Sequence, residues 1–412
     1  MGLIKKIQEM KHEMTRWRKK LHAEPELAFE ERGTARFLMR QLQSFGIETH
    51  SLAKTGVVGV LHGSLGSAAD TGGKAIMFRA DMDALPIQED SHEPHASKTR
   101  GVHHACGHDG HMAMLLGAAK HLAQTKNFSG TIYFVFQPAE EHIGGAAAMI
   151  REGLFQKFPC DEVYGLHNVP GLPLGSMASG AGPLLAASDE FHIIFSGTGG
   201  HTSSAEKATN VIGAAAEVVT ALKALADKEI PAGEPALLTV CSLVTNSQTA
   251  NVLPDTVEIQ GSIRDFDQGL HDRLKQGMET IVRDAALKHG AEATIEFKNG
   301  YPSLVNSRKE TDFALAIAKD TVGDDKVTSV VPRSMGVEDF ACYLQQKPGN
   351  FMAIGTGRPD GKPSPDLHSA KYDFNDAALP IGASYWVKLA EKALPLFKAA
   401  PPANPGPAPA PS

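Results

Sequence analysis

Short runs of β-forming apolar residues alternate with helical stretches in the N-terminal part of this chain, and this alternation restricts the fold to a few layered arrangements. The strand-like runs occur at Gly56–Leu61, Ala75–Phe78 and Thr131–Phe136, and apolar positions recur at helical spacing from about His111 to Gln124. Strands joined by helices form a buried, largely parallel sheet with helices on its faces. We therefore expect an α/β fold, preceded by two helices between Ile4 and Gln43 that are separated near Pro25.

A second pattern begins near Ser188. Its segments follow the order strand, helix, strand, strand, helix, strand, at Phe191–Phe195, Val211–Ala226, Leu237–Val244, Thr256–Ile263, Asp272–His289 and Ala293–Phe297. This order is typical of a small ferredoxin-like α+β domain with an antiparallel sheet. The first pattern resumes at Lys309 and ends in a helix from Leu379 to about Lys398. We therefore expect residues 187–298 to form an inserted domain, residues 1–186 and 299–398 to form the main domain, and the Pro/Ala-rich residues 399–412 to be disordered.

The overall composition excludes several classes of protein. The 412 residues predict two to three domains at about 150 residues each. A net charge of -7 offers no broad basic surface for nucleic acid. No apolar run reaches the ~18 residues that a membrane span needs, and the N-terminus is polar, so we expect a cytoplasmic protein.

The four cysteines are far apart and form no CxxC pair, which argues against a disulfide framework or a zinc ribbon. Three of them, Cys160, Cys241 and Cys342, are expected to be buried packing residues. A special role for Cys106 would have to come from its chemistry.

Polar residues with metal-binding side chains follow two of the strand-like runs. Arg79–Pro86 comes after the second run and Gln137–Glu141 after the third, while the His-rich stretch His103–His111 opens a helix between them. Ligands of α/β sheets gather at the carboxyl ends of the strands. A thiolate with imidazoles suits Zn, Mn, Ni or Co, so Cys106 and His108 are the first ligand pair we name. Gly107 and Gly110 should let the backbone turn tightly there.

Several of these residues have ordinary alternatives. Taken alone, a His-rich turn fits surface or capping roles as well as metal binding. His167 could be a satisfied histidine at a strand end, and His368 a surface histidine in a polar loop. The pair Glu338–Asp339 could cap a helix or lie beside a substrate, and both interpretations stay open. The adjacent Glu140 and Glu141 point in different directions and can take different roles.

Eight spaced motifs together resemble the M20 metallopeptidase family. They are Arg79–Pro86, His104–His111, Phe136–Glu141, Leu166–Val169, Gly199–His201, Asn251–Asp255, Gly336–Phe340 and Leu367–His368. More narrowly, they are similar to its branch of hippurate hydrolases, aminoacylases and auxin-conjugate amidohydrolases. The resemblance implies a catalytic α/β domain with an inserted lid and dimerisation domain, which agrees with the pattern of strands and helices.

The resemblance also implies a paired site for two divalent metal ions. Its ligands would be Cys106, His108, Glu141, His167 and His368, with Cys106 at the place of a bridging ligand. Glu140 would be the general base, taking a proton from water and passing it to the leaving amine. Asp83 would orient a histidine ligand. Asp81 stays unassigned, and His103, His104 and His111 are expected to support the ligands or the structure.

In the inserted domain, the resemblance gives His201 the role of stabilising the oxyanion in the active site of a partner subunit. Asn251 and Arg264 would grip the substrate carboxylate. A homodimer or higher oligomer follows from a His201 that acts in trans. Ala205, Glu206 and Val337 depart from the residues common in relatives, which predicts an unusual acyl pocket.

The sequence thus predicts a metal-dependent amidohydrolase that cleaves N-acyl amino acids such as hippurate to a carboxylic acid and an amino acid. A dipeptidase or carboxypeptidase with the same two-metal site is the close alternative. A metal-binding protein without activity is a more distant one, because it predicts the loss of the base or of a ligand, and none is lost. No GxSxG or P-loop motif is present.

Overall fold

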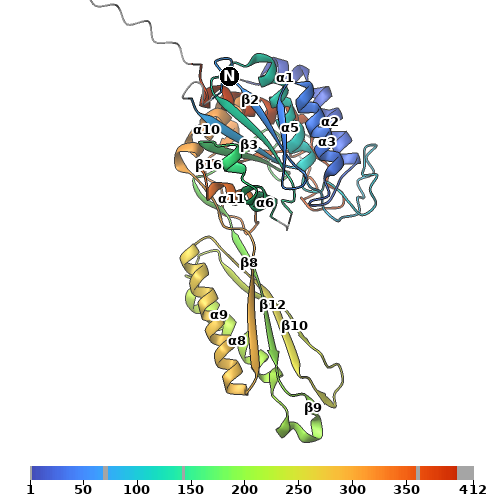
Figure 1. Ribbon diagram of the computed structural model, residues 1–412, viewed down its shortest axis with the longest axis vertical. Helices are drawn as coiled ribbons and strands as arrows, with labels where there is room; N and C mark the ends of the chain where they lie inside the picture. Colours follow the sequence, from blue (N-terminus) through green and yellow to red (C-terminus); the bar gives the residue numbers. More distant parts are fainter. Residues whose placement is uncertain (1, 68–72, 142–143, 359–361, 397–412) are drawn as a thin grey trace, which may run out of the picture.

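Two lobes make up the structure, a computed structural model that describes residues 2–67, 73–141, 144–358 and 362–396. The large lobe is an α/β body, and the small lobe is a narrow extension that reaches away from it (Figure 1). The Pro/Ala-rich tail that the sequence predicts to be disordered, residues 399–412, lies outside the described residues.

An eight-stranded sheet forms the centre of the large lobe, in the order β1-β2-β4-β3-β5-β16-β6-β15. The bounds of its strands are β1 Glu48–Leu52, β2 Gly56–His62, β3 Ala75–Asp81, β4 Thr131–Gln137, β5 Glu162–Val169, β6 Met177–Ala178, β15 Val327–Thr328 and β16 Gly349–Gly355. The central neighbours β4, β3, β5 and β16 are parallel, whereas β1, β2 and β4 pair antiparallel at one side. The predicted mostly parallel sheet is therefore confirmed, and β3, β4 and β5 end at one common edge.

Helices cover both faces of this sheet. They are α1 Lys5–Glu9, α2 Lys11–Ala23, α3 Arg32–Ser44, α5 His108–Thr125, α6 Gly145–Arg151, α7 Leu154–Lys157, α10 Arg308–Val322, α11 Phe340–Leu344 and α12 Leu379–Ala393, with short 3₁₀ turns η2 Asp324–Lys326 and η3 Asp376–Ala378. The N-terminal helical region has three helices rather than the two predicted, but the break around Pro25 is present. There, the Glu26 carboxylate accepts the backbone N–H groups of Gly33 and Thr34, at 2.9 and 2.8 Å, and so caps the start of α3.

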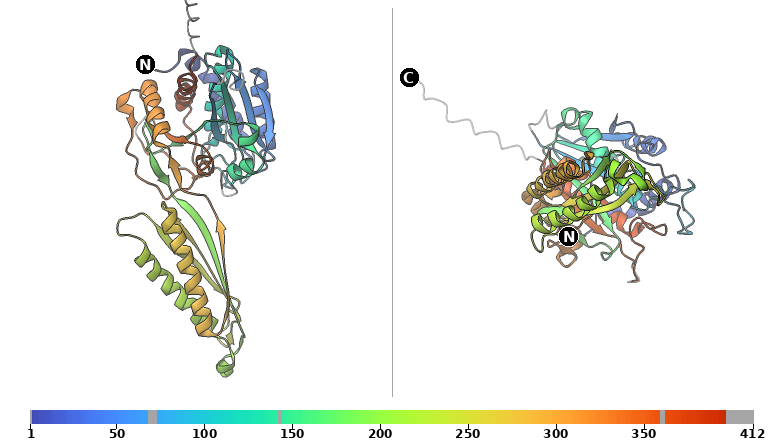
Figure 2. Two further views of the ribbon diagram at one scale, coloured as in Figure 1. Left: turned by 60° about the vertical axis from the view of Figure 1, so that its left-hand side comes forward. Right: turned by 90° about the horizontal axis from the view of Figure 1, so that it is seen from below.

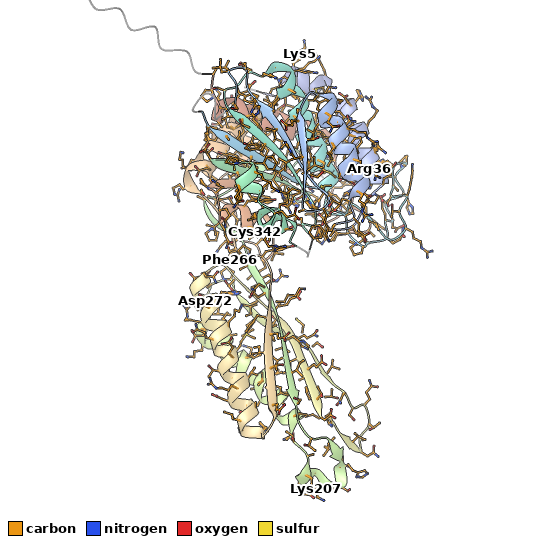
Figure 3. All side chains as sticks on the ribbon, in the orientation of Figure 1. Lys5, Arg36, Lys207, Phe266, Asp272 and Cys342 are labelled. Atoms are coloured by element: carbon orange, nitrogen blue, oxygen red, sulfur yellow. The ribbon has the colours of Figure 1, made fainter. Side chains whose placement is uncertain are left out.

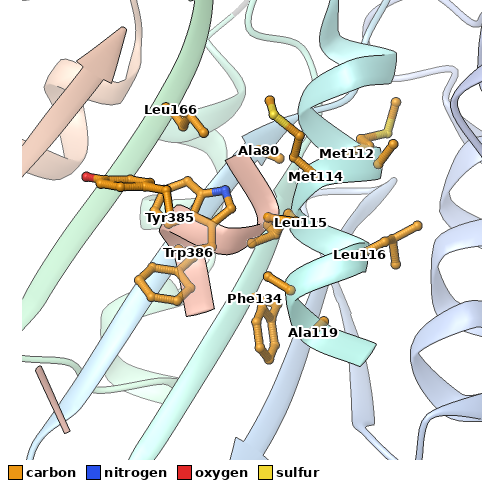
Figure 4. Packing of buried hydrophobic residues seen from close by; sticks show 14 of the residues in the cluster. Ala80, Met112, Met114, Leu115, Leu116, Ala119, Phe134, Leu166, Tyr385 and Trp386 are labelled. Carbon is orange, nitrogen blue, oxygen red and sulfur yellow. The ribbon is translucent and has the colours of Figure 1, made fainter. Parts of the chain in front are cut away.

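Helix α5 is buried along nearly its whole length and anchors the main core. Its apolar side chains, with those of α12, pack on β3, β4 and β5 (Figure 4). Trp386 of α12 lies over Phe78 of β3 with ring centroids 4.6 Å apart. Because α5 is fixed on both sides, its N-terminal turn is held firmly at the edge where the three strands end.

The small lobe has the predicted β-α-β-β-α-β order. Its elements are β8 Ala187–Ser196, α8 Val211–Glu229, β10 Leu237–Thr245, β12 Thr256–Asp265, α9 Gln268–His289 and β13 Glu292–Asn299. The sheet order is β10-β12-β8-β13, with every pair antiparallel. Helices α8 and α9 cover one face of this sheet (Figure 2). At the far tip, β9 Gly200–His201 pairs with β11 Val252–Leu253 beside η1 Thr202–Lys207.

The chain passes between the lobes twice, near residues 187 and 301, and the two passages are bonded to each other. On the large-lobe side, β7 Gly182–Leu185 pairs with β14 Leu304–Asn306. On the small-lobe side, His271 lies between Asp265, at 2.6 Å, and Asp189, at 3.1 Å. Hydrogen bonds to these two carboxylates raise the pKa of His271 to about 9. The base of the small lobe is therefore held by a charged cluster.

The prediction that three of the cysteines are buried is wrong for one of them. Cys160 is buried and Cys342 half-buried. Cys241 is exposed, so the prediction for Cys241 was wrong: alternate side chains of β10 point away from the small-lobe core, which Leu238 and Val240 contact and Cys241 does not. Among the described residues, no helix is long and apolar enough to cross a membrane.

Candidate functional site

The turn between β3 and α5 brings Cys106 and His108 to the edge where the strands end. Gly107, between them, has a left-handed backbone with φ 89°. A Cβ at Gly107 would also overlap the carboxamide of Asn168 and the hydroxyl of Tyr372. Gly110 was predicted to serve the same turn, but it lies inside α5, where its missing side chain admits the ring of Phe374. Gly107 alone makes the turn, and Gly110 makes room for close packing.

The structure brings all five predicted metal ligands together. The ligand atoms of Cys106, His108 and Glu141 lie within 4.8 Å of one another. The Cys106 Sγ is 3.5 Å from the His167 Nε2. The His368 Nε2 is 3.2 Å from the Glu141 Oε1. The sulfur therefore lies between His167 on β5 and the Glu141–His368 pair, whose members lie on two loops.

Two of the histidines have a defined orientation that suits ligation. The Nδ1 of His108 is 2.9 Å from the carbonyl oxygen of Asp83, and the Nδ1 of His167 is 2.8 Å from that of Asn168. A proton on each Nδ1 satisfies these carbonyls and leaves the Nε2 lone pair for a metal. The buried Nε2 of His108 has no hydrogen-bond partner among the residues that the structure describes. The donor set and this unpaired nitrogen fit a metal pair.

Burial and close neighbours shift the pKa values of three candidate ligands, His167, His368 and Cys106. Burial, with His111 nearby, lowers the pKa of His167 to about 3, so that its imidazole is neutral as a ligand must be. Hydrogen bonds to Cys106 and Glu141 raise the pKa of His368 to about 10. Burial raises the pKa of the Cys106 thiol.

His368 is the most exposed of the five, with a side chain 49% accessible to solvent. Its backbone is left-handed, with φ 64°, which is uncommon for a residue other than glycine. A hydrogen bond of 2.9 Å from its N–H to the carbonyl oxygen of Ala105 holds it there. Backbone strain of this kind is concentrated at functional sites, and here it aims the imidazole at Glu141.

Glu140 follows β4 in a tight turn that other segments hold. Ala139 before it has a left-handed backbone with φ 53°. Three side chains bind the backbone of this turn. Glu31 accepts the Ala139 N–H at 2.9 Å, Asp83 accepts the Glu141 N–H at 3.0 Å, and Tyr301 donates to the Glu140 carbonyl at 2.5 Å. Asp339 accepts the N–H of Ala146, in the helix α6 that follows, at 2.8 Å. Glu140 itself is 7% exposed. The base candidate is thus placed by contacts from four distant parts of the chain.

The carboxylate of Glu140 lies in a region of excess negative charge. Burial raises its pKa well above the ordinary value, and the nearby Glu338, Glu141 and Asp339 add to the rise. Carboxylate oxygens of Glu140, Glu338 and Asp339 all lie within 4.8 Å of one another. A carboxyl group in such surroundings readily accepts a proton.

Arg79 compensates much of this charge, a role that its sequence motif did not reveal. The guanidinium is buried, and it donates to Asp81 at 2.7 Å, to Glu338 at 2.9 Å and to Asp339 at 3.0 Å. Glu338 also accepts the N–H of Phe340 at 2.8 Å, so it binds the start of α11 as well as Arg79. The one sequence signal for this role is a charged residue in the middle of the apolar β3 run.

Asp81 and His111 lie beside the ligands, but other groups already use their polar atoms. Asp81 accepts from Arg79 and lies 2.6 Å from the Nδ1 of His111. The Nε2 of His111 is 2.5 Å from the carboxamide oxygen of Asn168. These contacts favour positioning roles over ligation. Asp83 lies beside His108, whose Nδ1 is 2.9 Å from the Asp83 carbonyl oxygen, and its carboxylate accepts the Glu141 N–H at 3.0 Å.

The structure does not bring the three small-lobe candidates to this site. His201 and Asn251 lie at the tip of the small lobe, at the end opposite the large lobe; the Nδ1 of His201 accepts the N–H of Ser203 at 3.1 Å (Figure 1). Lys207, at the end of the η1 turn that follows His201, marks this tip in Figure 3. Arg264 lies near the junction of the lobes, where it donates to the carbonyl of Met335 at 2.5 Å.

Comparisons with known proteins agree with this geometry. A model of the peptidase family M20/M25/M40 matches residues 77–392. The hippurate hydrolase of Campylobacter jejuni is 36% identical over 395 residues, which cover 96% of this chain and 100% of that protein. Thermostable carboxypeptidase 1 of Saccharolobus solfataricus is 34% identical over 404 residues, 95% of this chain and 99% of that one. A dinuclear metal-binding peptidase of the M20 family from Bacillus subtilis has a solved structure that matches with a TM-score of 0.79 and 30% identity, over 94% of this chain and 99% of that one.

Proposed function

The chain belongs to the peptidase family M20/M25/M40, and on that premise we propose that it is a two-metal amidohydrolase whose substrates are N-acyl amino acids. The family and its relatives make it a metal-dependent enzyme that hydrolyses amide bonds. The products would be a carboxylic acid and an amino acid. The similarity to a hippurate hydrolase along the whole chain supports this substrate class.

One observation carries the proposal: five donor side chains of the right kinds converge beside a buried carboxylate. Cys106, His108, Glu141, His167 and His368 would hold the two metal ions. Imidazole and thiolate donors favour Zn, Mn, Ni or Co over Mg or Ca. When bound, the metal ions would polarise the amide carbonyl and lower the pKa of a water molecule.

Glu140 is the general base of the proposed reaction. Its carboxylate accepts a proton from the attacking water and passes that proton to the amide nitrogen, while the water oxygen bonds to the carbonyl carbon and the carbon–nitrogen bond breaks. The turn around Ala139 keeps Glu140 buried and separate from Glu141, which points to the metal cluster. The two neighbouring glutamates thereby divide the roles of base and ligand.

A second candidate function is that of a carboxypeptidase or dipeptidase with the same site. The similarity to thermostable carboxypeptidase 1 supports this second candidate. The two activities differ in whether the enzyme accepts a free α-amino group or an acyl group at the cleaved bond. A ratio of rates on benzoyl-glycine and on Gly-Phe would decide between them.

We further propose that two subunits associate through the small lobe. His201 and Asn251 lie too far out to serve their own metal cluster, which supports a role in the site of a partner copy. Strand β10 is a free edge of the small-lobe sheet and exposes Leu237, Leu243 and Val244. An apolar free edge suits pairing with a second copy of the same strand.

The experiment that tests the function uses protein stripped of metal by a chelator. Hydrolysis of benzoyl-glycine, a panel of N-acyl amino acids and Gly-Phe is measured before and after Mn or Zn is restored. Activity that disappears with chelation and returns with metal on the acyl substrates supports the proposal. A Glu140→Gln variant should bind the same amount of metal without turnover. Inactivity of the metal-loaded wild type on every substrate would overturn the proposed function.

A further inference from the structure

Tyr301 lies in the second passage between the two lobes, between β13 and β14. Its backbone carbonyl accepts the N–H of Ser188, in the first passage, at 2.9 Å. The N–H of the preceding Gly300 donates to the Asp189 carboxylate at 3.1 Å. The backbone of Tyr301 is therefore part of the connection that sets how the small lobe is attached.

The side chain of Tyr301 reaches from this connection to the active-site turn. Its hydroxyl donates a hydrogen bond of 2.5 Å to the carbonyl oxygen of Glu140 and accepts the N–H of Gly144 at 3.1 Å. Burial raises the pKa of Tyr301, and the carboxylates of Asp339 and Glu140 add to the rise, so the hydroxyl keeps the proton that it donates. One hydroxyl thus joins the two sides of the turn.

The peptide group between Glu140 and Glu141 is the unit that this contact fixes. Its carbonyl belongs to Glu140 and, in the described part of the chain, accepts a hydrogen bond from Tyr301 alone. Its N–H belongs to Glu141 and donates to Asp83 at 3.0 Å. Tyr301 and Asp83 therefore hold opposite ends of the one peptide group that joins the proposed base to the proposed ligand. Rotation of that group would move the Glu140 carboxylate relative to the five candidate metal ligands.

We propose that Tyr301 is a positioning residue that clamps the Glu140–Glu141 peptide and makes the placement of the base depend on the attachment of the small lobe. This inference rests on the proposed function, because Glu140 acts there as the general base. A shift of the connection between the lobes moves the backbone of Tyr301, and the hydroxyl transmits the shift to the Glu140 carbonyl.

The test compares Tyr301→Phe with the wild type as full-length, metal-loaded protein on benzoyl-glycine. The change removes one hydroxyl and keeps the ring. The kcat should fall by about 10- to 100-fold, because misplacement of a catalytic group by a fraction of an ångström has effects of that order. Metal content and Tm should stay near those of the wild type, and KM should change much less than kcat. Tyr133→Phe is the matched control, because Tyr133 lies on β4 and, among the described residues, its hydroxyl makes no hydrogen bond to the turn.

Hydrogen exchange provides a readout that does not depend on the substrate. The amide protons of Glu141 and Gly144 should exchange faster in Tyr301→Phe than in Tyr133→Phe. A kcat equal to that of the control, or a loss of kcat matched by losses of Tm and metal, would overturn the positioning role. If the wild type is inert on the whole substrate panel, the proposed function fails, and unchanged exchange in Tyr301→Phe would then reject the clamp separately.

Discussion

Replacement of Arg79 by methionine should destabilise the large lobe strongly. Methionine fills much of the same volume but removes the charge and every donor. The guanidinium binds Gln137 at 2.8 Å, Asp81 at 2.7 Å, Glu338 at 2.9 Å and Asp339 at 3.0 Å. The loss would leave three buried carboxylates without their cation.

The expected cost is about 3 to 5 kcal/mol, the range found when one partner of a buried ion pair is removed. In a domain of this size, such a loss lowers Tm by on the order of 10 °C. The loss should grow as the pH rises, because the stranded carboxyl groups can become neutral only by binding protons. Burial already raises the pKa of Asp339 to about 8 even with Arg79 present, so the added cost should be largest above that pH.

Thermal and urea unfolding of the full-length protein at several pH values measure this effect. Arg79→Lys should be intermediate, because one ammonium group cannot reach all four partners. Arg283→Met, which breaks an exposed pair with Asp284 at 3.1 Å, is the surface control and should cost less than about 1 kcal/mol. If Arg79→Met unfolds within about 1 kcal/mol of the wild type even above pH 8, the assignment of a charge-compensating role is refuted.

Three more predictions address the site and the small lobe. Cys106→Ser should lower metal content as measured by elemental analysis of dialysed protein, and full retention would contradict a bridging thiolate. His201→Ala and Glu140→Gln should each be inactive. A mixture of the two variants should recover about a quarter of wild-type activity after subunit exchange, because half of the dimers are mixed and each mixed dimer has one complete site of two. No recovery would argue against action in trans. The pKa of His271 is raised from 6.5 to about 9 in the folded protein. The stability that its protonated form contributes is therefore fully present below pH 6.5 and is lost as the pH rises through 9. His271→Gln should therefore abolish much of the fall in small-lobe stability over that interval, followed by circular dichroism, and an unchanged pH profile would rule out the cluster.

The local patterns that identified the fold are short in sequence. The strands at Ala75–Phe78 and Thr131–Phe136 were recognised from their composition, and the structure extends them to Asp81 and Gln137. Strand β5 was implied only by the interpretation of His167 as a residue at a strand end, and β16 was not singled out. Their neighbours in the sheet come from distant parts of the chain, and pairing between residues such as Gly165 and Phe351 leaves no periodic signal.

The candidate ligands could be named because each lies in a recognisable motif, and the structure groups them at one edge. The assignment of Glu140 as base remains a prediction, as do the roles of His201, Asn251 and Arg264. Arg79 and Tyr301 could not be assigned from sequence. Arg79 meets Glu338 across 259 residues, and Tyr301 meets Glu140 across 161, and no local rule connects such positions.

The sequence by itself determined the α/β class, the inserted β-α-β-β-α-β unit and the resemblance to the family, because these depend on residue type and on the spacing of short motifs. The candidate ligands beyond Cys106 and His108 followed from that resemblance. The tertiary structure decided the rest. It placed Cys106 between His167 and Glu141, set Arg79 among three carboxylates, and linked the active-site turn to the small lobe through Tyr301. Contacts of this kind arise only when packing brings remote segments together. A buried charge is costly unless it is paired, so its partner can come from any segment that the fold places beside it.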